Sequence, residues 1–223
     1  MARYSRAPWI LRVTLSLGVA GVTRRKPVIG LAGGIGAGKS QVARILGELG
    51  AAVIDSDALA GEALDDEEVI AAIRSAWGAA VLTADGRVDR TKLRRVFDHR
   101  NERRRLEALI HPRVARQREA LVAHYGADPR VAAIVLDSPL LFEAGVAASC
   151  DAIVFVDCDD AVRQARVAAS RGWTPQQLQA REKAQKPLDF KKRRADYVVS
   201  NNSTVDELRR QVTELFPRLI DCP

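Results

Sequence analysis

The 223-residue sequence contains few of the residues that build metal centres and disulfide frameworks. Its three cysteines, Cys150, Cys158 and Cys222, are odd in number and show no Cys-x-x-Cys spacing. Its three histidines form no metal-ligand pattern either. The sequence therefore predicts neither a disulfide framework nor a zinc site, and its cysteine usage favours a reducing compartment.

No apolar run is long enough to predict a membrane span. The longest candidate, Trp9–Val22, is interrupted by Arg12, and a spanning helix needs about 20 apolar residues. It belongs to an N-terminal segment, residues 1–26, that has six basic residues and no acidic one. A transit peptide, a signal peptide, an unstructured leader and a start codon placed too far upstream all fit this composition. We expect residues 1–26 to lie outside the fold.

Aromatic residues are scarce, and outside that segment so is excess charge. The net charge is +7, but six of these charges lie in residues 1–26, so the remainder is nearly neutral. Two basic clusters, Arg103–Arg105 and Lys191–Arg194, have acidic neighbours and no interleaved aromatic residues. We interpret both clusters as solvated helix faces and expect no nucleic-acid partner and no membrane partner.

The most informative stretch is Val28–Ser40, with the sequence VIGLAGGIGAGKS. A short apolar run leads into four glycines, and the spacing Gly-x4-Gly-Lys-Ser is that of a phosphate-binding P-loop. The residues that follow, Gln41–Leu49, have the apolar spacing of an amphipathic helix. Strand, glycine-rich turn and helix in one register predict a binding site for a nucleoside triphosphate.

The residue types of this loop suit a phosphate. Glycines allow the backbone to wrap closely around an anion, so that successive N–H groups point at the β-phosphate. Lys39 is placed to reach the β- and γ-phosphates, and the Ser40 hydroxyl to bind a magnesium ion. We expect the nucleotide to contact Gly33, Gly34, Gly36, Ala37, Gly38, Lys39, Ser40 and Gln41.

Further apolar runs predict the rest of a sheet. Buried strands are expected at Ala51–Asp57, Val131–Asp137 and Ala152–Asp157, with a short fifth strand at Tyr197–Val199. Continuous apolar runs that end in Asp are typical of parallel strands covered on both faces. The predicted fold class is α/β: a P-loop three-layer sandwich with a parallel five-stranded sheet.

Two segments between these strands are predicted to be helical. The pattern over Ala58–Ala127 is helical throughout, and Pro112 should end or kink a long helix over Asn101–Tyr125 near Ile110–His111. A later helix, Gln176–Lys186, is polar nearly all round and follows an N-cap at Thr174. We expect the first segment to stand beside the sheet and the second to be solvent-bridging or mobile.

The chain lacks the motifs of several classes of P-loop protein. A GTPase needs an Asn-Lys-x-Asp motif, which is absent, and the strand that ends at Asp137-Ser138 lacks the Asp-Glu ending of many translocases. A short chain with a helical insert and a late polar segment favours a small-molecule kinase.

The motifs of the chain resemble those of the dephospho-coenzyme A kinase family, in the same order, over about residues 28–202. The matching pieces are IGLAGGIGAGKS, VIDSDALA, ADGRVDRTKL, the Ile-His-Pro around His111, SPLLFEAG, Arg181 with Gln185, Ala195-Asp196 and Asn201. The resemblance implies transfer of the γ-phosphate of ATP to the ribose 3′-hydroxyl of dephospho-coenzyme A, with Mg²⁺, as the last step of coenzyme A synthesis.

The resemblance also implies a division of the chain. The kinase domain is expected at 27–223, with a core of 27–57, 131–165 and 195–223. An acceptor-binding insert is expected at 58–130 and a lid at 166–194.

Catalytic roles are assigned on the same basis. Asp57 is expected to orient the acceptor hydroxyl and take its proton, and Asp55 to hold a magnesium-bound water. Alternatively, this pair only caps the helix that follows. Arg166 is the preferred arginine for the transferring phosphoryl group, with Arg171 next, although either side chain could simply be solvated. Arg163 shares a helix face with Arg166.

Binding residues complete the prediction. His111, Leu141 and Glu143 are expected to contact the acceptor, although a lone histidine is as often structural. Asn201 is expected near the adenine. Asp137 either holds a magnesium-bound water or caps its strand. Many family members have Thr in place of Gln41, and an Arg or His in place of Gly61, so one contact to each substrate differs here.

Two rival functions remain open at this point. A nucleoside monophosphate kinase would accept AMP or CMP, and a P-loop regulator would hydrolyse ATP only when bound to nucleic acid. We expect a cytoplasmic protein, monomeric or weakly oligomeric, with organellar targeting by residues 1–26 as an alternative.

Overall fold

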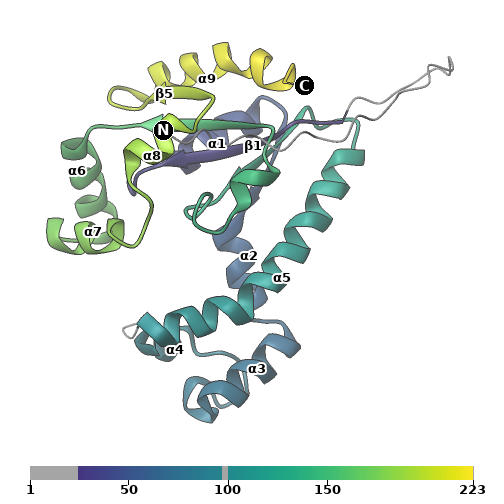
Figure 1. Ribbon diagram of the computed structural model, residues 1–223, viewed down its shortest axis with the longest axis vertical. Coiled ribbons are helices and arrows are strands. Elements are labelled where there is room, and N and C mark those ends of the chain that lie inside the picture. The colour runs from purple at the N-terminus through teal and green to yellow at the C-terminus, as the bar shows by residue number, and fades with distance from the viewer. Residues whose placement is uncertain (1–24, 97–99, 223) are drawn as a thin grey trace, which may run out of the picture.

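The computed structural model describes residues 25–96 and 100–222 (Figure 1). Trp9–Val22 and the side chain of Arg103 therefore lie outside what the structure describes. Arg25 and Lys26, which we had assigned to the extension, contact the folded part: Arg25 pairs with Asp151, and the Lys26 ammonium donates to the Tyr125 carbonyl oxygen at 3.0 Å. The folded part therefore includes at least these two residues.

A five-stranded, all-parallel sheet forms the centre of the molecule, in the strand order β2-β3-β1-β4-β5. The strands are β1 (Val28–Gly33), β2 (Ala51–Asp55), β3 (Ala133–Asp137), β4 (Ala152–Asp157) and β5 (Tyr197–Ser200). The predicted parallel sheet is confirmed. The central strand, β1, has neighbours reached by crossovers on both sides, which makes its carboxyl end the topological switch point where ligands bind in such sheets.

The register of the strands decides which carboxylates meet. Asp55 at the end of β2 is the register partner of Asp137 at the end of β3, and Asp137 is also level with Leu31 of β1. β1 continues to Gly33 beyond this level. The two aspartates therefore lie side by side, on one side of the start of the phosphate-binding loop.

Alternating residues of each strand build two cores, one on each face of the sheet. Ile29 and Leu31 pack with Leu46 of helix α1 (Lys39–Glu48) and Val212 of helix α9 (Val205–Ile220) on one face. On the other face, Val28 and its neighbours pack with residues of the helices that follow β2. Ile29 and Leu31 are fully buried, and burying each stabilises the fold by about 1.5–3 kcal/mol. The three layers expected from the apolar runs are present.

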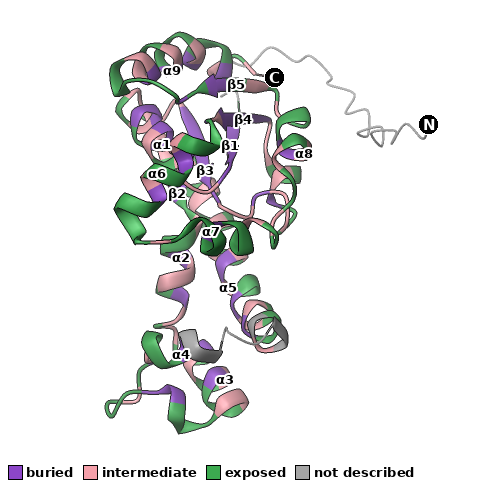
Figure 2. Cartoon of the chain, turned by 90° about the vertical axis from the view of Figure 1, so that its left-hand side faces the viewer, coloured by how far each residue is buried: buried purple, intermediate pink, exposed green. Residues whose placement is uncertain are grey.

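The residues that the structure describes between β2 and β3 form four helices and a 3₁₀ turn. They are α2 (Ser56–Ala63), α3 (Glu67–Trp77), η1 (Ala79–Val81), α4 (Arg90–Val96) and α5 (Arg100–Ala127). In both views α3 and α4 lie far from α9, at the other end of the molecule (Figures 1 and 2). The inner strands β1, β3 and β4 are largely buried, whereas α3 and α4 carry many exposed residues (Figure 2). The expected buried strand at Ala51–Asp57 is wrong in part: β2 ends at Asp55 and is a partly exposed edge strand.

Pro112 lies inside α5 and does not end it, since the helix continues to Ala127. Of the two expected outcomes, an end of the helix is wrong. The ribbon of α5 changes direction along its length (Figure 1), and a proline, which removes one backbone hydrogen bond, is the usual cause of such a bend. Packing of α5 against α2 and β3 explains why the helix persists.

The late polar segment forms two helices after α6 (Asp160–Arg171): α7 (Pro175–Glu182) and α8 (Leu188–Arg193). Thr174 and Gln177 form a capping box at the start of α7, so the predicted N-cap is confirmed. The prediction of a solvated basic face is wrong for Lys191, which is 2% exposed. Its ammonium reaches Gln185 Oε1 at 2.9 Å and Glu143 Oε1 at 3.0 Å, and these partners compensate the buried charge.

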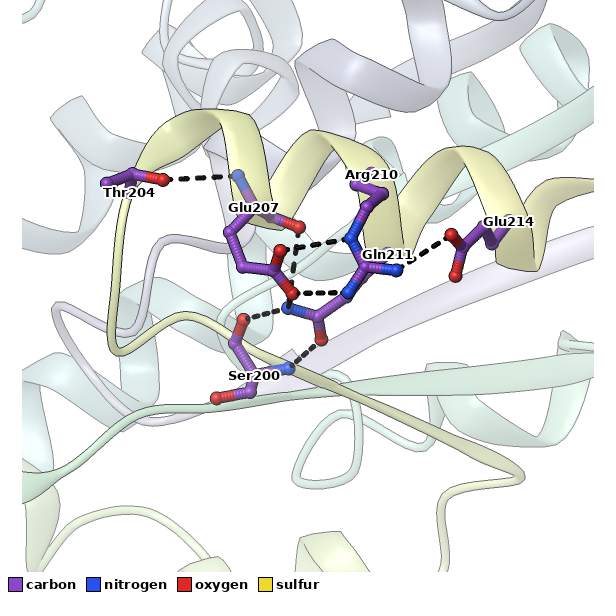
Figure 3. Close-up of polar contacts among 6 residues, drawn as sticks. All are labelled: Ser200, Thr204, Glu207, Arg210, Gln211 and Glu214. Carbon is purple, nitrogen blue, oxygen red and sulfur yellow. Dashed lines mark hydrogen bonds and ion pairs between the residues drawn. The ribbon is translucent and has the colours of Figure 1, made fainter.

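Helix α9 closes the chain against β5 (Figure 3). Thr204 caps its first turn by accepting a hydrogen bond from the Glu207 amide at 3.2 Å. The Gln211 amide group donates to the Ser200 carbonyl and accepts from the Ser200 amide at 2.9 Å. Arg210 bridges Glu207 and Glu214. These contacts fix the edge strand to the helix that covers it.

Within the described residues, no helix combines the length and apolar character needed to cross a membrane.

Candidate active site

The loop between β1 and α1 has the backbone form that a phosphate cradle requires. Gly38 has φ +92°, and a Cβ at this position would lie 2.2 Å from Asn201 Nδ2. Gly36 has φ +79°, and its Cβ would meet Val167 at 2.7 Å. Any side chain at these two positions would both strain the backbone and clash with its neighbours. The glycines therefore reflect close packing under the loop as well as its curvature.

Lys39 lies over the loop that it follows. Its ammonium is 3.4 Å from the Gly33 carbonyl oxygen and 3.3 Å from that of Gly34. Burial lowers the pKa of Lys39, and the nearby charges of Asp137 and Asp57 act in the opposite direction. Lys39 is half-buried, and its hydrogen bonds among the described residues go to carbonyl oxygens alone, so an anion would complete its contacts.

Ser40 and Asp137 are joined directly across the sheet edge. The Ser40 hydroxyl donates to Asp137 Oδ2 at 2.8 Å, and Asp137 is 7% exposed. Burial raises the pKa of Asp137, while the Ser40 hydrogen bond and the charge of Lys39 oppose this. A hydroxyl and a carboxylate side by side, beside a phosphate cradle, are oxygen donors of the kind Mg²⁺ accepts.

Asp55 and Asp57 have different roles in the structure, although the sequence did not separate them. Asp55 Oδ1 accepts from the amides of Asp57 at 2.8 Å and Ala58 at 3.1 Å, so Asp55 is the N-cap of α2. Asp57 lies in the first turn of α2, and its side chain lines a cavity. The capping alternative therefore applies to Asp55, whose second carboxylate oxygen remains available.

The Asp57 carboxyl is set up to accept a proton. Burial raises its pKa, and the charges of Asp55 and Asp137 raise it further, whereas Lys39 and Arg171 lower it. Because Asp57 and Lys39 influence each other's pKa, the carboxylate and the phosphate-binding ammonium belong to one site. A carboxylate with a raised pKa is a stronger general base than an ordinary aspartate.

The predicted arginines are distributed over several contacts. Arg166 Nη1 lies 3.4 Å from Cys158 Sγ, and its Nη2 lies 3.4 Å from Asn201 Oδ1. Arg171 is exposed, and its guanidinium lies 4.9 Å from the centre of the Trp173 ring. Neither forms an ion pair with a residue that the structure describes, so both stay candidates for phosphate contacts.

Arg163 does not reach the site together with Arg166. It is 3% exposed, and its Nη1 donates to the Ile35 carbonyl oxygen at 3.0 Å and to Glu182. Arg163 therefore joins the phosphate-binding loop to α7. The sequence pattern could not reveal this, because Glu182 and Ile35 are far from Arg163 in the chain.

Asn201 supports the loop from below. Its Nδ2 donates to the Ala37 carbonyl oxygen at 2.8 Å, and the residue is 6% exposed. Contact with the adenine stays a prediction. Gln41 is half-buried in the first turn of α1, and its side chain forms no hydrogen bond with the described residues.

A cavity of 1180 Å³ opens beside Asp57. Its walls come from α2, α5, the segment after β3 and α7, and they include His111, Arg118 and Arg181. Ligand pockets usually measure about 300–1,000 Å³, so this cavity has room for a long substrate. Arg118 and Trp173 were missed at the sequence level. Arg118 lies seven residues after His111, a spacing that puts both on one helix face.

Leu141 and Glu143 lie outside the lining of this cavity. Leu141 is 2% exposed and packs in the core against Gly30. Glu143 Oε1 accepts from the Lys186 amide at 2.7 Å and pairs with Lys191. The direct contact of both residues with the acceptor stays a prediction.

Three or more side chains of His, Cys, Asp or Glu do not gather into a ready metal cluster anywhere in 25–96 or 100–222.

A parallel sheet whose central strand runs into this loop, with a general-base candidate and a large cavity at the same edge, defines a P-loop kinase of small molecules. Comparisons with solved structures support the fold. The chain is 33% identical to TT1252 from Thermus thermophilus, with a TM-score of 0.74 over 88% of this chain and 99% of that one. Dephospho-CoA kinase from Campylobacter jejuni, 18% identical over 87% and 97% of the two chains with a TM-score of 0.62, shares the fold.

The family follows from sequence comparison. A family model described as Dephospho-CoA kinase matches residues 27–207. Dephospho-CoA kinase of Geobacillus kaustophilus is 40% identical over 84% of this chain and 94% of its own length. That of Geobacter metallireducens is 41% identical over 87% and 97%. The chain belongs to the dephospho-CoA kinase family, as its motifs had indicated.

Proposed function

We propose that this protein transfers the γ-phosphoryl group of ATP to the ribose 3′-hydroxyl of dephospho-coenzyme A, giving coenzyme A and ADP. The observation that carries the proposal is the position of Asp57. Asp57 lines the large cavity, and its charge and that of Lys39 in the phosphate-binding loop each shift the pKa of the other. One site therefore has a place for the triphosphate, a base and a space for a bulky alcohol. Family membership supports the same reaction.

The donor half of the reaction is assigned to the loop and its supports. The backbone amides of the loop and Lys39 hold the β- and γ-phosphates, and Ser40 with Asp137 would hold Mg²⁺, with Asp55 near enough to bind one of its waters. When bound, Mg²⁺ neutralises charge on the β- and γ-oxygens. Arg166 and Arg171 are our candidates for further charge neutralisation.

The acceptor half is assigned to Asp57 and the cavity. The Asp57 carboxylate accepts a hydrogen bond from the 3′-hydroxyl and orients its oxygen toward the γ-phosphorus. As the new O–P bond forms, the bond from the γ-phosphorus to the ADP leaving oxygen breaks, and the hydroxyl proton passes to Asp57 and then to water. His111 is assigned to acceptor binding because it lines this cavity.

The proposal also includes the domain division of the chain, its compartment and its oligomeric state. We assign 58–130 to acceptor binding, 166–194 to a lid and the remaining parts of 27–223 to the core. The three cysteines are all free, which suits a reducing, cytoplasmic setting. A monomer or weak oligomer is expected, and sedimentation of the purified protein measures this directly.

One assay separates this function from its rivals. ADP release from ATP and Mg²⁺ is measured with dephospho-coenzyme A, AMP, CMP or RNA added singly. We expect turnover with dephospho-coenzyme A alone, and NMR of the product should place the new phosphate on the 3′-oxygen. Turnover with AMP or CMP instead would indicate a nucleoside monophosphate kinase. Stimulation by RNA alone would contradict a small-molecule kinase altogether.

A further inference from the structure

One wall of the cavity is formed by a single face of α5. Leu106, Ile110 and Val114 recur at intervals of four residues and give this wall an apolar track. His111 and Arg118 line the same wall. The wall therefore offers an apolar surface with cationic side chains set along it.

Arg118 differs from the other arginines that are removed from solvent. Arg113 of the same helix pairs with Asp66 at 2.7 Å, and Arg163 pairs with Glu182. Arg118 is partly buried and lines the cavity, yet it forms no hydrogen bond or ion pair with any residue in the described ranges. A partly desolvated guanidinium without a carboxylate partner is costly unless an anionic ligand completes it.

No carboxylate among the described residues forms an ion pair with Arg118. The charge of Arg118 reaches Cys150, where it opposes the burial that raises the pKa of that thiol to about 12, and Asp151 acts on the same thiol. The acidic residues of the cavity lining are Asp57 and Glu107. Glu107 lies eleven residues earlier on α5, roughly 16 Å along the helix at 1.5 Å per residue. Arg118 thus marks a cationic part of the cavity, away from Glu107.

We propose that Arg118 binds the 5′-pyrophosphate of the acceptor and is a main determinant of acceptor affinity. This inference rests on the proposed function, which places the ribose hydroxyl at Asp57 in the same cavity. The acceptor is an adenosine whose ribose carries a pyrophosphate and then a long arm. With the ribose hydroxyl held at Asp57, the pyrophosphate lies against another wall of the cavity and needs a cation there. The planar guanidinium of Arg118 can donate two parallel hydrogen bonds to it.

The test compares Arg118→Met with Arg116→Met. Arg116 lies on the same helix, is exposed and does not line the cavity, so it is a matched control. In Arg118→Met the KM for dephospho-coenzyme A should rise about 10- to 100-fold, the usual effect of losing a charge-assisted contact. The KM for ATP and kcat should change less than about threefold, and Arg116→Met should leave all three near the wild-type values.

Adenosine distinguishes charge recognition from a general disturbance of the cavity. Used as a competitive inhibitor against dephospho-coenzyme A, it lacks the pyrophosphate, so its Ki should be the same in the wild type and in Arg118→Met. Arg118→Lys should give an intermediate KM because it keeps the charge and loses the bidentate geometry. If thermal unfolding shows that Arg118→Met does not fold, Arg118→Lys against Arg116→Lys decides the question.

Two outcomes would overturn the inference. One is a KM for dephospho-coenzyme A that rises no more in the Arg118 variants than in the Arg116 controls. The other is a Ki for adenosine that rises by the same factor as that KM. Failure of the proposed function is a separate result, since the wild-type enzyme would then not phosphorylate dephospho-coenzyme A at all.

Discussion

The donor and acceptor halves of the site differ in how their side chains are held. In the donor half, Ser40 bonds to Asp137, Asn201 to the Ala37 carbonyl and Arg163 to the Ile35 carbonyl. In the acceptor half, His111 and Arg118 have no hydrogen bond or ion pair within the described part of the chain. The proposed donor site is therefore braced in the free protein, whereas these two side chains of the proposed acceptor cavity are available to a ligand.

This difference reflects the two substrates. A triphosphate is compact and highly charged. A rigid loop binds it well because the loop loses little conformational entropy on binding. The acceptor is long and joins polar to apolar parts, so it needs a larger space with few fixed contacts. Asp57 lies where the two halves meet, and variants of the two halves should fail in different ways.

The largest effect is expected from the donor half. Lys39→Ala removes the ammonium above the loop, and kcat should fall on the order of 10³-fold or more because the charge on the transferring group is no longer stabilised. Lys183→Ala, an exposed lysine that ends α7, is the control and should be near wild type. A Lys39→Ala enzyme with nearly full kcat would break the assignment of the loop as the donor site.

At the junction, Asp57→Asn should lower kcat at least about 10²-fold, since an amide cannot accept the hydroxyl proton. The KM for ATP should change little, which separates this variant from Lys39→Ala. Asp206→Asn, in the first turn of α9, controls for loss of an acid at a helix start. Turnover close to wild type in Asp57→Asn would remove Asp57 as the base and leave the family assignment intact.

Bracing of the donor half is tested by Arg163→Met. The variant leaves the Ile35 carbonyl and Glu182 without their partner, so the free energy of unfolding should fall by about 2–3 kcal/mol. Thermal unfolding measures this, with Arg209→Met as control: Arg209 forms an exposed pair with Glu48 at 2.6 Å, worth less than about 1 kcal/mol. Equal losses in both variants would show that Arg163 is not a brace.

The smallest effect concerns pH. Asp55→Asn keeps the cap of α2, since Asn caps as well as Asp, but removes a charge that raises the pKa of Asp57. Asp57 works deprotonated, so activity falls as the pH drops through its pKa. A lower pKa should move the acid limb of kcat/KM toward lower pH. An unchanged acid limb would show that Asp57 does not set it.

The sequence predicted the sheet and the phosphate loop well, because both depend on local patterns. Continuous apolar runs identified all five strands, and glycine spacing located the loop. The split between Asp55 and Asp57 was not predictable, because it depends on α2 starting at Ser56. Composition alone could not show which of two neighbouring carboxylates turns toward a cavity.

Long-range pairing explains the other errors. Its place in a basic cluster predicts that Lys191 is a surface residue. The ion pair with Glu143, which is far away in the sequence, makes its burial possible. The helical spacing predicts that Arg163 and Arg166 share one helix face. Arg163 instead donates hydrogen bonds to the phosphate-binding loop and to α7. Helix α5 survives Pro112 because its neighbours hold it. In each case the deciding contact joins segments that no local pattern connects.

The bend of α5 has one more consequence. Leu106 and Ile110 line the cavity before Pro112, and Val114 and Arg118 line it after. A single proline therefore divides the wall into two helical segments, one on each side of the bend. Tilting one segment against the other would change the width of the cavity while the phosphate-binding loop, on another part of the chain, kept its shape.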